Sequence, residues 1–302
     1  LSIKAEEKPG DADKFVYEDI EGCPPMTLAG ERDTSPEAIR KLEHCLTMIP
    51  DTKSMHTDEN GIYTEQRQKL HKLIISRMRE HAKCTAEKQA PVAIFTGGVP
   101  GSGKTTFLKK YAPFLLEKDI FTIDADKIRE QLPENKGWNS KIGHQEAHDI
   151  YMQLLDEISE GKPCKYDILW DGTMNKAKNY LPLIGKLHKL GYKIYAIYVN
   201  VPPEVSRQRV LDRYKKTGRY VPIEVVNDAN KAGNQGFLQL KDKIEGYMTV
   251  DGVTGEITGK GGEQIIEGRG YFDKPATGNE AKIKKAKAMA AAQKQKLILL
   301  TL

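Results

Sequence analysis

Residues 97–106 read Gly97-Gly98-Val99-Pro100-Gly101-Ser102-Gly103-Lys104-Thr105-Thr106, and from the second glycine onward they fit the pattern G-x-x-x-x-G-K-[ST] completely. A short apolar run at 92–95 precedes this stretch, and a helix-compatible run at 106–111 follows it. This strand–loop–helix context is the one that a phosphate-binding loop, or P-loop, requires. The glycines let backbone N–H groups turn inward around a polyphosphate, and the helix N-terminus adds partial positive charge. The stretch therefore predicts a bound nucleoside triphosphate rather than a chance glycine-rich turn.

Two side chains of the P-loop have the chemistry for direct contact with the nucleotide and its metal. Lys104 has the length to reach the β- and γ-phosphates, and the Thr105 hydroxyl is placed to bind Mg²⁺. The predicted donor is ATP or GTP, between which the sequence does not choose. The residues predicted to bind the nucleotide are Gly98, Val99, Pro100, Gly101, Ser102, Gly103, Lys104, Thr105 and Thr106.

The composition favours a globular protein over a membrane protein or a disulfide framework. With 39% hydrophobic and 29% charged residues, a chain of 302 residues has enough apolar material for one large domain or two small ones. No apolar run approaches the ~20 residues that span a bilayer, and residues 1–8 lack the apolar core of a secretory signal. The cysteines are scattered and form no C-x-x-C pair, which predicts free thiols and a reducing, cytoplasmic location. They are Cys23, Cys45, Cys84 and Cys164.

The positive charge is concentrated at the C-terminal end. The formal net charge is +5, but residues 281–302 hold six lysines and no acid. Without this segment, 41 basic residues face 42 acidic ones, a net charge of −1. A near-neutral body argues against nucleic acid as a partner of the core. Contact with nucleic acid or an anionic surface stays open for the tail, although a solvated charge run is the favoured interpretation.

Alternating strand-like and helix-like segments begin at residue 91. Such alternation predicts an α/β fold, in which a mainly parallel sheet is sandwiched by helices. Ligands then bind beyond the carboxyl ends of the strands. The expected strands are 92–96, 119–124, 167–171 and 193–200, and the expected helices follow residue 104 and cover 144–160 and 179–190.

The chain divides by pattern into three parts. Residues 1–88 predict an irregular arm and a helical extension, because Ser35 followed by Pro reads as a helix start and a second helix begins near Thr64. Residues 89–275 form the predicted P-loop domain, which ends in glycine-rich hairpins. Residues 276–302, rich in Ala and Lys, form a predicted basic tail.

Two carboxylates at the end of the second expected strand point to catalysis. Asp124 and Asp126 are two residues apart, so on an extended backbone they share a face beside the P-loop. A carboxylate at this place can accept the proton of a substrate hydroxyl as the oxygen attacks the γ-phosphoryl group. Asp126 is the predicted base, and Asp124 is left open between a functional role and an N-cap of the following helix.

Further candidates lie at the next strand end and in a basic helix. Asp171 ends an apolar strand, where nucleotide-binding folds place a carboxylate that orients Mg²⁺ through water. After the fourth strand comes a helix whose arginines can close over the triphosphate and neutralise charge on the transferring group. For four basic residues of this helix a solvated face is the favoured interpretation: Arg207, Arg209, Lys215 and Lys216.

These motifs, in this order and spacing, resemble the zeta toxin family of P-loop kinases. In that family a strand ending D-x-D follows the P-loop, and the next strand ends in acid-Gly-Thr. A helix ending Arg-Tyr then precedes a further Arg shortly before a Pro. The resemblance covers residues 91–231, roughly half of the chain. The matching stretches are Asp124-Ala125-Asp126 with Pro133, Asp171-Gly172-Thr173, Val201-Pro202, Arg213-Tyr214 and Arg219-Tyr220-Val221-Pro222.

The resemblance implies a P-loop kinase-like fold, a reaction and a set of site residues. The implied reaction moves the γ-phosphate to the 3′-hydroxyl of the amino sugar in UDP-N-acetylglucosamine, with Mg²⁺ as cofactor. Many family members are paired with a small antitoxin, so an antitoxin or immunity protein is an expected partner. The implied roles are Asp126 as base, Lys104, Arg213 and Arg219 as stabilisers of the transferring group, and Asp171 and Thr173 in the substrate and Mg²⁺ region. Asp124 and Arg129 are also predicted on the substrate side, and Thr105 with Asp171 at Mg²⁺.

The acceptor is less tightly specified than the reaction. Asp171 stands where the family prototype carries Glu. A polynucleotide 5′-hydroxyl kinase and another small-molecule kinase are alternative enzymes, because sites around the base are similar in these classes. A nucleotide-binding scaffold that transfers no phosphate is the alternative outside enzymes.

Overall fold

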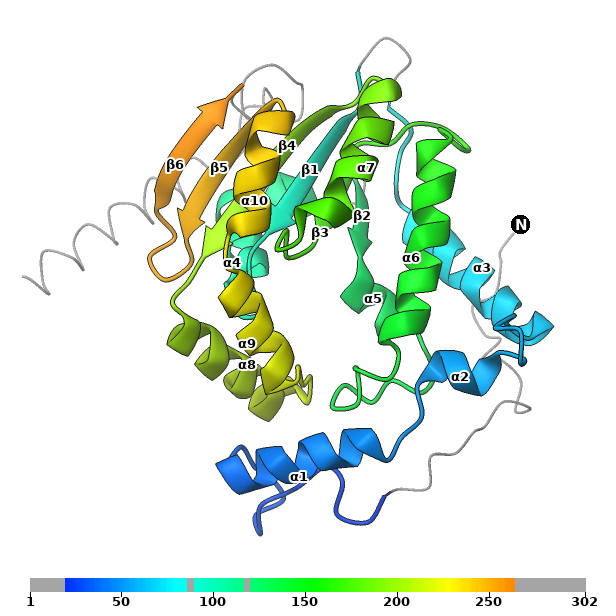
Figure 1. The fold of residues 1–302 in the computed structure, drawn as a ribbon, viewed down its shortest axis with the longest axis vertical. Coiled ribbons are helices and arrows are strands. Elements are labelled where there is room, and N and C mark those ends of the chain that lie inside the picture. Colours follow the sequence, from blue (N-terminus) through cyan, green and yellow to red (C-terminus); the bar gives the residue numbers. More distant parts are fainter. Residues whose placement is uncertain (1–19, 86–89, 117–119, 264–302) are drawn as a thin grey trace, which may run out of the picture. The chain divides into compact units, whose positions relative to one another are not determined.

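The computed structural model describes residues 20–85, 90–116 and 120–263 (Figure 1). It divides the chain into a compact unit, Leu1–Gly262, and a second unit, Glu263–Leu302, that falls almost entirely outside the described residues. The predicted basic tail and the first part of the predicted N-terminal arm lie outside them as well. The boundaries at residues 88 and 275 stay a prediction.

A six-stranded sheet with the order β2-β3-β1-β4-β5-β6 forms the centre of the first unit. All neighbouring strands pair in parallel except β5 and β6, which are antiparallel. Every residue of β1 is buried, as expected for a parallel strand covered on both faces. The strands are β1 Val92–Gly97, β2 Phe121–Asp124, β3 Ile168–Asp171, β4 Lys193–Asn200, β5 Gly246–Asp251 and β6 Ile257–Gly262.

Helices cover the sheet, which confirms the predicted α/β class. In Figure 1, α7 and α10 lie in front of the strands and α4 lies behind them. The predicted helix starts are also confirmed, because the hydroxyls of Ser35 and Thr64 accept hydrogen bonds from Ala38 N and Arg67 N. The helices are α1 Pro36–Thr47, α2 Thr52–His56, α3 Glu65–Arg79, α4 Lys104–Tyr111, α5 Ala125–Arg129, α6 His144–Ser159, α7 Ala177–Lys189, α8 Pro203–Thr217, α9 Ile223–Ala232 and α10 Gln235–Leu240.

A buried ionic network joins the N-terminal helices to the rest of this unit. Arg67 donates to both oxygens of Glu134 at 2.9 Å and to both oxygens of Glu146 at 2.5 and 2.8 Å. His56 and His71 contact the same two carboxylates at 2.7 and 2.6 Å. Burial alone would raise the pKa values of the carboxyls, but hydrogen bonds from the histidines and Arg67 lower both to about 2. Breaking such a network leaves an unpaired buried charge, so α2 and α3 are firmly held.

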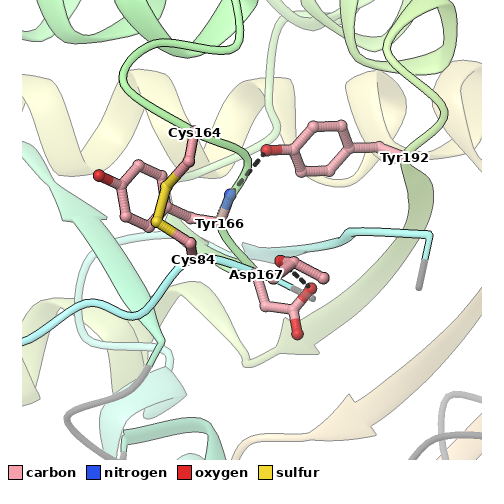
Figure 2. The surroundings of a disulfide bond; sticks show 6 residues. Cys84, Cys164, Tyr166, Asp167 and Tyr192 are labelled. Atoms are coloured by element: carbon pink, nitrogen blue, oxygen red, sulfur yellow. Dashed lines mark hydrogen bonds between the residues drawn. A yellow bond between two sulfur atoms is a disulfide. The ribbon is translucent and has the colours of Figure 1, made fainter. Parts of the chain in front are cut away.

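Two disulfides, Cys23–Cys45 and Cys84–Cys164, show that the prediction of free thiols is wrong. The partners are 22 and 80 residues apart in sequence, but their Cα atoms are 6.1 and 5.8 Å apart. Figure 2 shows the second bridge beside Tyr166, whose backbone N–H donates to the Tyr192 hydroxyl at 3.3 Å. The fold brings these cysteines together, and their spacing in the sequence does not predict the pairing. Stable disulfides are typical of oxidising compartments, so the cytoplasmic location stays a prediction.

Removing the Cys84–Cys164 bridge is expected to destabilise the fold without unfolding it. The bridge closes a long loop, and such bridges stabilise by about 2–4 kcal/mol, largely through the unfolded state. The Cys84→Ser/Cys164→Ser variant is expected to lose this free energy of unfolding in denaturant titrations without reductant. In dithiothreitol, the free energy of unfolding of the wild type should fall towards the value of the variant. Alkylation of these two thiols in native, unreduced protein would contradict the bridge.

In the described part of the chain, no helix has the length and apolar character needed to cross a bilayer.

Candidate active site

At Gly98 and Gly101, the loop between β1 and α4 combines a positive φ with backbone packing that leaves no room for a Cβ. Gly98 has φ +134°, and a Cβ there would lie 2.4 Å from the carbonyl oxygen of Val199. Gly101 has φ +77°, and a Cβ there would lie 2.6 Å from the carbonyl oxygen of Ser206. Helix α4 begins at the motif lysine, directly after this loop. The loop thus has the close backbone packing and helix N-terminus of a phosphate cradle.

The polar side chains of the loop fit a nucleotide. The ammonium group of Lys104 donates to the carbonyl oxygen of Gly98 at 2.9 Å, so the side chain folds back along the loop. Ser102 Oγ is buried and has no hydrogen-bond partner among the described residues. Thr105 and Thr106, at the start of α4, are exposed. A polyphosphate in the loop would meet the Ser102 hydroxyl, the exposed hydroxyls of Thr105 and Thr106 and the N-terminus of α4, and Lys104 would exchange the Gly98 carbonyl for a phosphate oxygen.

A row of polar residues crosses the carboxyl ends of β1, β3 and β2. The parallel register places Thr96 opposite Asp171, and Asp171 opposite Asp124. The Thr96 hydroxyl donates to Oδ1 of Asp171. Because neighbouring strands lie about 4.8 Å apart, the row spans roughly 10 Å from the strand that leads into the P-loop. It therefore brings Asp124 and Asp171, predicted from separate motifs, to one edge of the sheet.

Asp126 lies at the start of α5 and forms ion pairs with Arg129 and Arg219. Its side chain is 30% exposed, so solvent or a substrate can reach it. Oδ1 of Asp124 accepts a hydrogen bond from the backbone N–H of Asp126 at 2.8 Å and caps α5. The N-cap alternative for Asp124 is therefore confirmed, and its contact with substrate stays a prediction.

The surroundings of Asp124 disfavour the charged form of its carboxyl. Burial, and then the like charge of Asp171, raise the pKa of Asp124 to about 6, although Lys127 and Arg219 act in the opposite direction. The folded state therefore binds this proton more tightly than the unfolded state does, and protonation of Asp124 stabilises the fold. This contribution to stability is present below the unfolded pKa of 3.8 and is lost as the pH rises through 6.

The Asp124→Asn variant is expected to be more stable than the wild type at about pH 8, and to approach wild-type stability near pH 4. Asparagine keeps the N-cap acceptor and removes the charge, so the gain at high pH is roughly 2 kcal/mol. Urea denaturation of both proteins at the two pH values, in metal-free buffer, measures the difference. The same gain at both pH values would show that the charge is not its source.

The two arginines after β4 are half-buried, and the side chain of Arg219 is 26% exposed. Burial lowers the pKa of Arg213, an effect that Glu130 opposes, and Nε of Arg213 has no partner among the described residues. Burial also lowers the pKa of Arg219, and the charge of Asp124 acts against it. Since guanidinium groups stay protonated well above neutral pH, both remain cations at a partly desolvated place. This is the arrangement in which an anionic ligand gains most.

Arg209 contacts the P-loop, so its predicted place on a solvated helix face is wrong. Its Nη1 donates to the carbonyl oxygens of Gly252, Ser102 and Gly101 at 2.9, 3.3 and 3.4 Å. The neighbouring Ser206 hydroxyl donates to the carbonyl of Pro100 at 2.8 Å. The usable signal in the sequence was the spacing of four residues between Arg209 and the next predicted arginine, which places both on one face of the helix.

Thr173 and Arg129 hold other parts of the site. The Thr173 carbonyl accepts from Gly98 N at 3.1 Å, and its hydroxyl contacts Oδ1 of Asn175 at 2.9 Å. Nη1 of Arg129 lies 3.2 Å from Nδ1 of His144 on α6. These contacts attach the segment after β3 to the P-loop, and α5 to α6. Substrate contacts of Thr173 and Arg129 stay predictions.

The residues present suit Mg²⁺ only together with a nucleotide. The described residues contain no group of three or more His, Cys, Asp and Glu side chains placed to hold a metal ion. The Thr105 hydroxyl is exposed at the loop, and Asp171 is held by Thr96 at the neighbouring strand end. Because Mg²⁺ favours oxygen ligands and keeps several waters, phosphate oxygens would complete this set.

The fold and the loop place the chain among P-loop proteins, and comparison with known proteins gives the family. The chain belongs to the zeta toxin family, whose model matches residues 75–267. The toxin PezT of Streptococcus pneumoniae serotype 4 (strain ATCC BAA-334 / TIGR4) is 24% identical over 144 residues, which are 46% of this chain and 56% of the toxin. The chain thus spans about half the length of the curated relative that it matches.

Solved structures share the fold at low identity. The PezAT chromosomal toxin–antitoxin system of S. pneumoniae superposes with a TM-score of 0.51 at 18% identity, over 77% of this chain and 97% of that one. The native AvrRxo1-ORF1:-ORF2 complex gives a TM-score of 0.56 at 18% identity, over 80% and 77% of the two chains. The same complex with ATP gives 0.54 at 18% identity, over 66% and 68%.

Proposed function

We propose that the chain is a Mg²⁺-dependent kinase that transfers the γ-phosphate of ATP or GTP to a hydroxyl of a nucleotide sugar. The 3′-hydroxyl of UDP-N-acetylglucosamine is the first acceptor to test. The observation that carries the proposal is the ion pair between Asp126 and Arg219 at the strand edge that also carries the P-loop. A carboxylate and a half-buried guanidinium in contact provide a proton acceptor and a cation at one place.

We assign a proposed role to each site residue. Lys104 and the amides of the P-loop bind the phosphates of the donor, and Arg213 and Arg219 neutralise charge on the transferring group. The acceptor oxygen forms a bond to the γ-phosphorus while the bond from phosphorus to the leaving diphosphate oxygen breaks. Asp126 takes the proton of the acceptor hydroxyl. Mg²⁺ would be held by Thr105 and, through water, by Asp171, and when bound it supplies charge neutralisation.

The proposed acceptor is tested by incubation with Mg-ATP and UDP-N-acetylglucosamine, followed by mass spectrometry. The expected product is one phosphate heavier than the sugar nucleotide. Matched reactions contain GTP as donor, a 5′-hydroxyl oligonucleotide as acceptor, or the Asp126→Asn variant as enzyme. Transfer to the oligonucleotide alone would replace the acceptor class and keep the kinase. Tight ATP binding with no transfer to any compound in a cell extract would favour the scaffold alternative.

An antitoxin or immunity protein is part of the proposal. Its support is that the PezAT structure is described as a toxin–antitoxin system and that AvrRxo1-ORF1 is solved in complex with ORF2. Induction of the chain in bacteria is expected to arrest growth, and Asp126→Asn is expected to remove the arrest. Growth arrest that persists in this variant would separate toxicity from phosphate transfer.

A further inference from the structure

Helix α1 lies outside the region matched by the zeta toxin family and packs against the segment that carries both site arginines. Its apolar face forms one buried cluster with Tyr214 and Tyr220, whose rings meet edge to face at 5.4 Å. Each of these tyrosines directly follows a site arginine in the sequence. The helical residues of the cluster are Ile39, Leu42 and Leu46. In Figure 1, α1 lies near the lower ends of α8 and α9.

Glu43 is the polar residue of α1 that contacts this segment. Its Oε1 accepts hydrogen bonds from the Tyr220 hydroxyl at 2.8 Å and from the backbone N–H of Ile223 at 3.1 Å. Helix α9 starts at Ile223 after Pro222, and it has no side-chain cap of its own. The carboxylate of Glu43 therefore satisfies the first N–H of α9 and complements its dipole. Burial, and then the hydrogen bond to Glu43, raise the pKa of Tyr220, so its hydroxyl stays a donor.

Contacts from two other directions hold the same turn. Nη1 of Arg32 donates to the carbonyl of Lys215 at 3.2 Å, before the left-handed Gly218. The backbone N–H of Tyr220 donates to the carbonyl of Gly137 at 3.3 Å. The Cys23–Cys45 disulfide joins α1 to the arm that carries Arg32. Arg219 thus lies in a short turn fixed on both sides by residues remote in sequence.

We propose that Glu43 is a positioning residue of the phosphate site. By holding Tyr220 and the first turn of α9, it fixes the backbone directly after Arg219 and aims this guanidinium at Asp126 and the γ-phosphate. Displacements of about 1 Å at such groups are costly, so a remote hydrogen bond can control a large effect. The inference rests on the proposed role of Arg219. It adds a residue of the N-terminal extension to the working site.

Calorimetric titration of the full chain with a non-hydrolysable ATP analogue and with ADP, each with Mg²⁺, tests this proposal without any acceptor. Arg219→Ala is expected to weaken binding of the ATP analogue about 10-fold or more and to leave ADP affinity within twofold, because ADP lacks the γ-phosphate. Glu43→Ala is expected to lower the ratio of ATP-analogue affinity to ADP affinity as well. Glu43→Gln retains an acceptor oxygen and is expected to restore most of this ratio. Glu37→Ala, an exposed change on the same helix, is the matched control.

The ADP titration separates positioning from loss of structure. A parallel loss of ADP and ATP-analogue affinity in Glu43→Ala would overturn the proposal, because general damage affects both. If that variant does not fold, Tyr220→Phe removes one donor and keeps the ring, and an unchanged preference there would overturn it equally. An unchanged preference in Arg219→Ala would reject the role of Arg219 and the role of Glu43 with it. If Arg219→Ala changes the ratio of ATP-analogue to ADP affinity and the Glu43 variants do not, only the proposed role of Glu43 is rejected.

Discussion

Replacing Asp126 by Asn is expected to lower the rate of phosphate transfer by about 10²- to 10⁴-fold, the usual loss when a general base is removed. Asparagine keeps the size of the side chain and an oxygen that can contact Arg219, but it cannot take the proton of the acceptor hydroxyl. Affinity for Mg-ATP should stay close to the wild-type value, because the P-loop is unchanged. Single-turnover transfer from labelled ATP, with binding measured by calorimetry, gives both quantities.

A matched variant makes this experiment specific to the site. Asp228→Asn makes the same chemical change on the exposed surface of α9, where the carboxylate pairs only loosely with Lys231, and it should transfer at the wild-type rate. Asp124 supplies the competing assignment, since its carboxyl lies two residues earlier and caps the same helix. Full activity in Asp126→Asn together with its loss in Asp124→Asn would move the base to Asp124.

Local patterns in the sequence predicted the parts of the site that strand ends create. The P-loop, Asp124 and Asp171 each follow an apolar run, and parallel pairing brings such positions to one edge. The individual strands and the helix starts at Ser35 and near Thr64 were also predictable, because each depends on residues within a few positions of one another.

Contacts between distant segments could not be predicted from those patterns. The disulfide partners are separated by up to 80 residues, and the spacing of the cysteines does not show which of them come together in the fold. The sequence does not distinguish Arg209 from the other basic residues of its helix, whereas in the fold Arg209 contacts P-loop carbonyls. Glu43 lies 177 residues from Tyr220, in a helix whose periodicity predicts burial of one face but not the partner of that face.

Replacing Lys104 by Ala is expected to damage both binding and transfer, in contrast to the loss of the base. The ammonium group is the cation of the phosphate loop, and in the structure it already lies 2.9 Å from the Gly98 carbonyl. Loss of a charged hydrogen bond to phosphate weakens binding by about 1.5–3 kcal/mol, or roughly 10- to 100-fold. Loss of a stabilising group for the transferring charge lowers turnover by about 10²- to 10³-fold.

The paired losses distinguish Lys104 from the acceptor side of the site. Calorimetry with Mg-ATP and single-turnover transfer should both report the defect, whereas Asp126→Asn should show it in transfer alone. Lys109→Ala removes an exposed lysine from the last turn of the same helix and serves as the control, with both quantities unchanged. Wild-type affinity for Mg-ATP in Lys104→Ala would mean that the triphosphate does not occupy the loop. In that case the assignments of Arg213 and Arg219 would fail with it, because they depend on a γ-phosphate held at that end of the sheet.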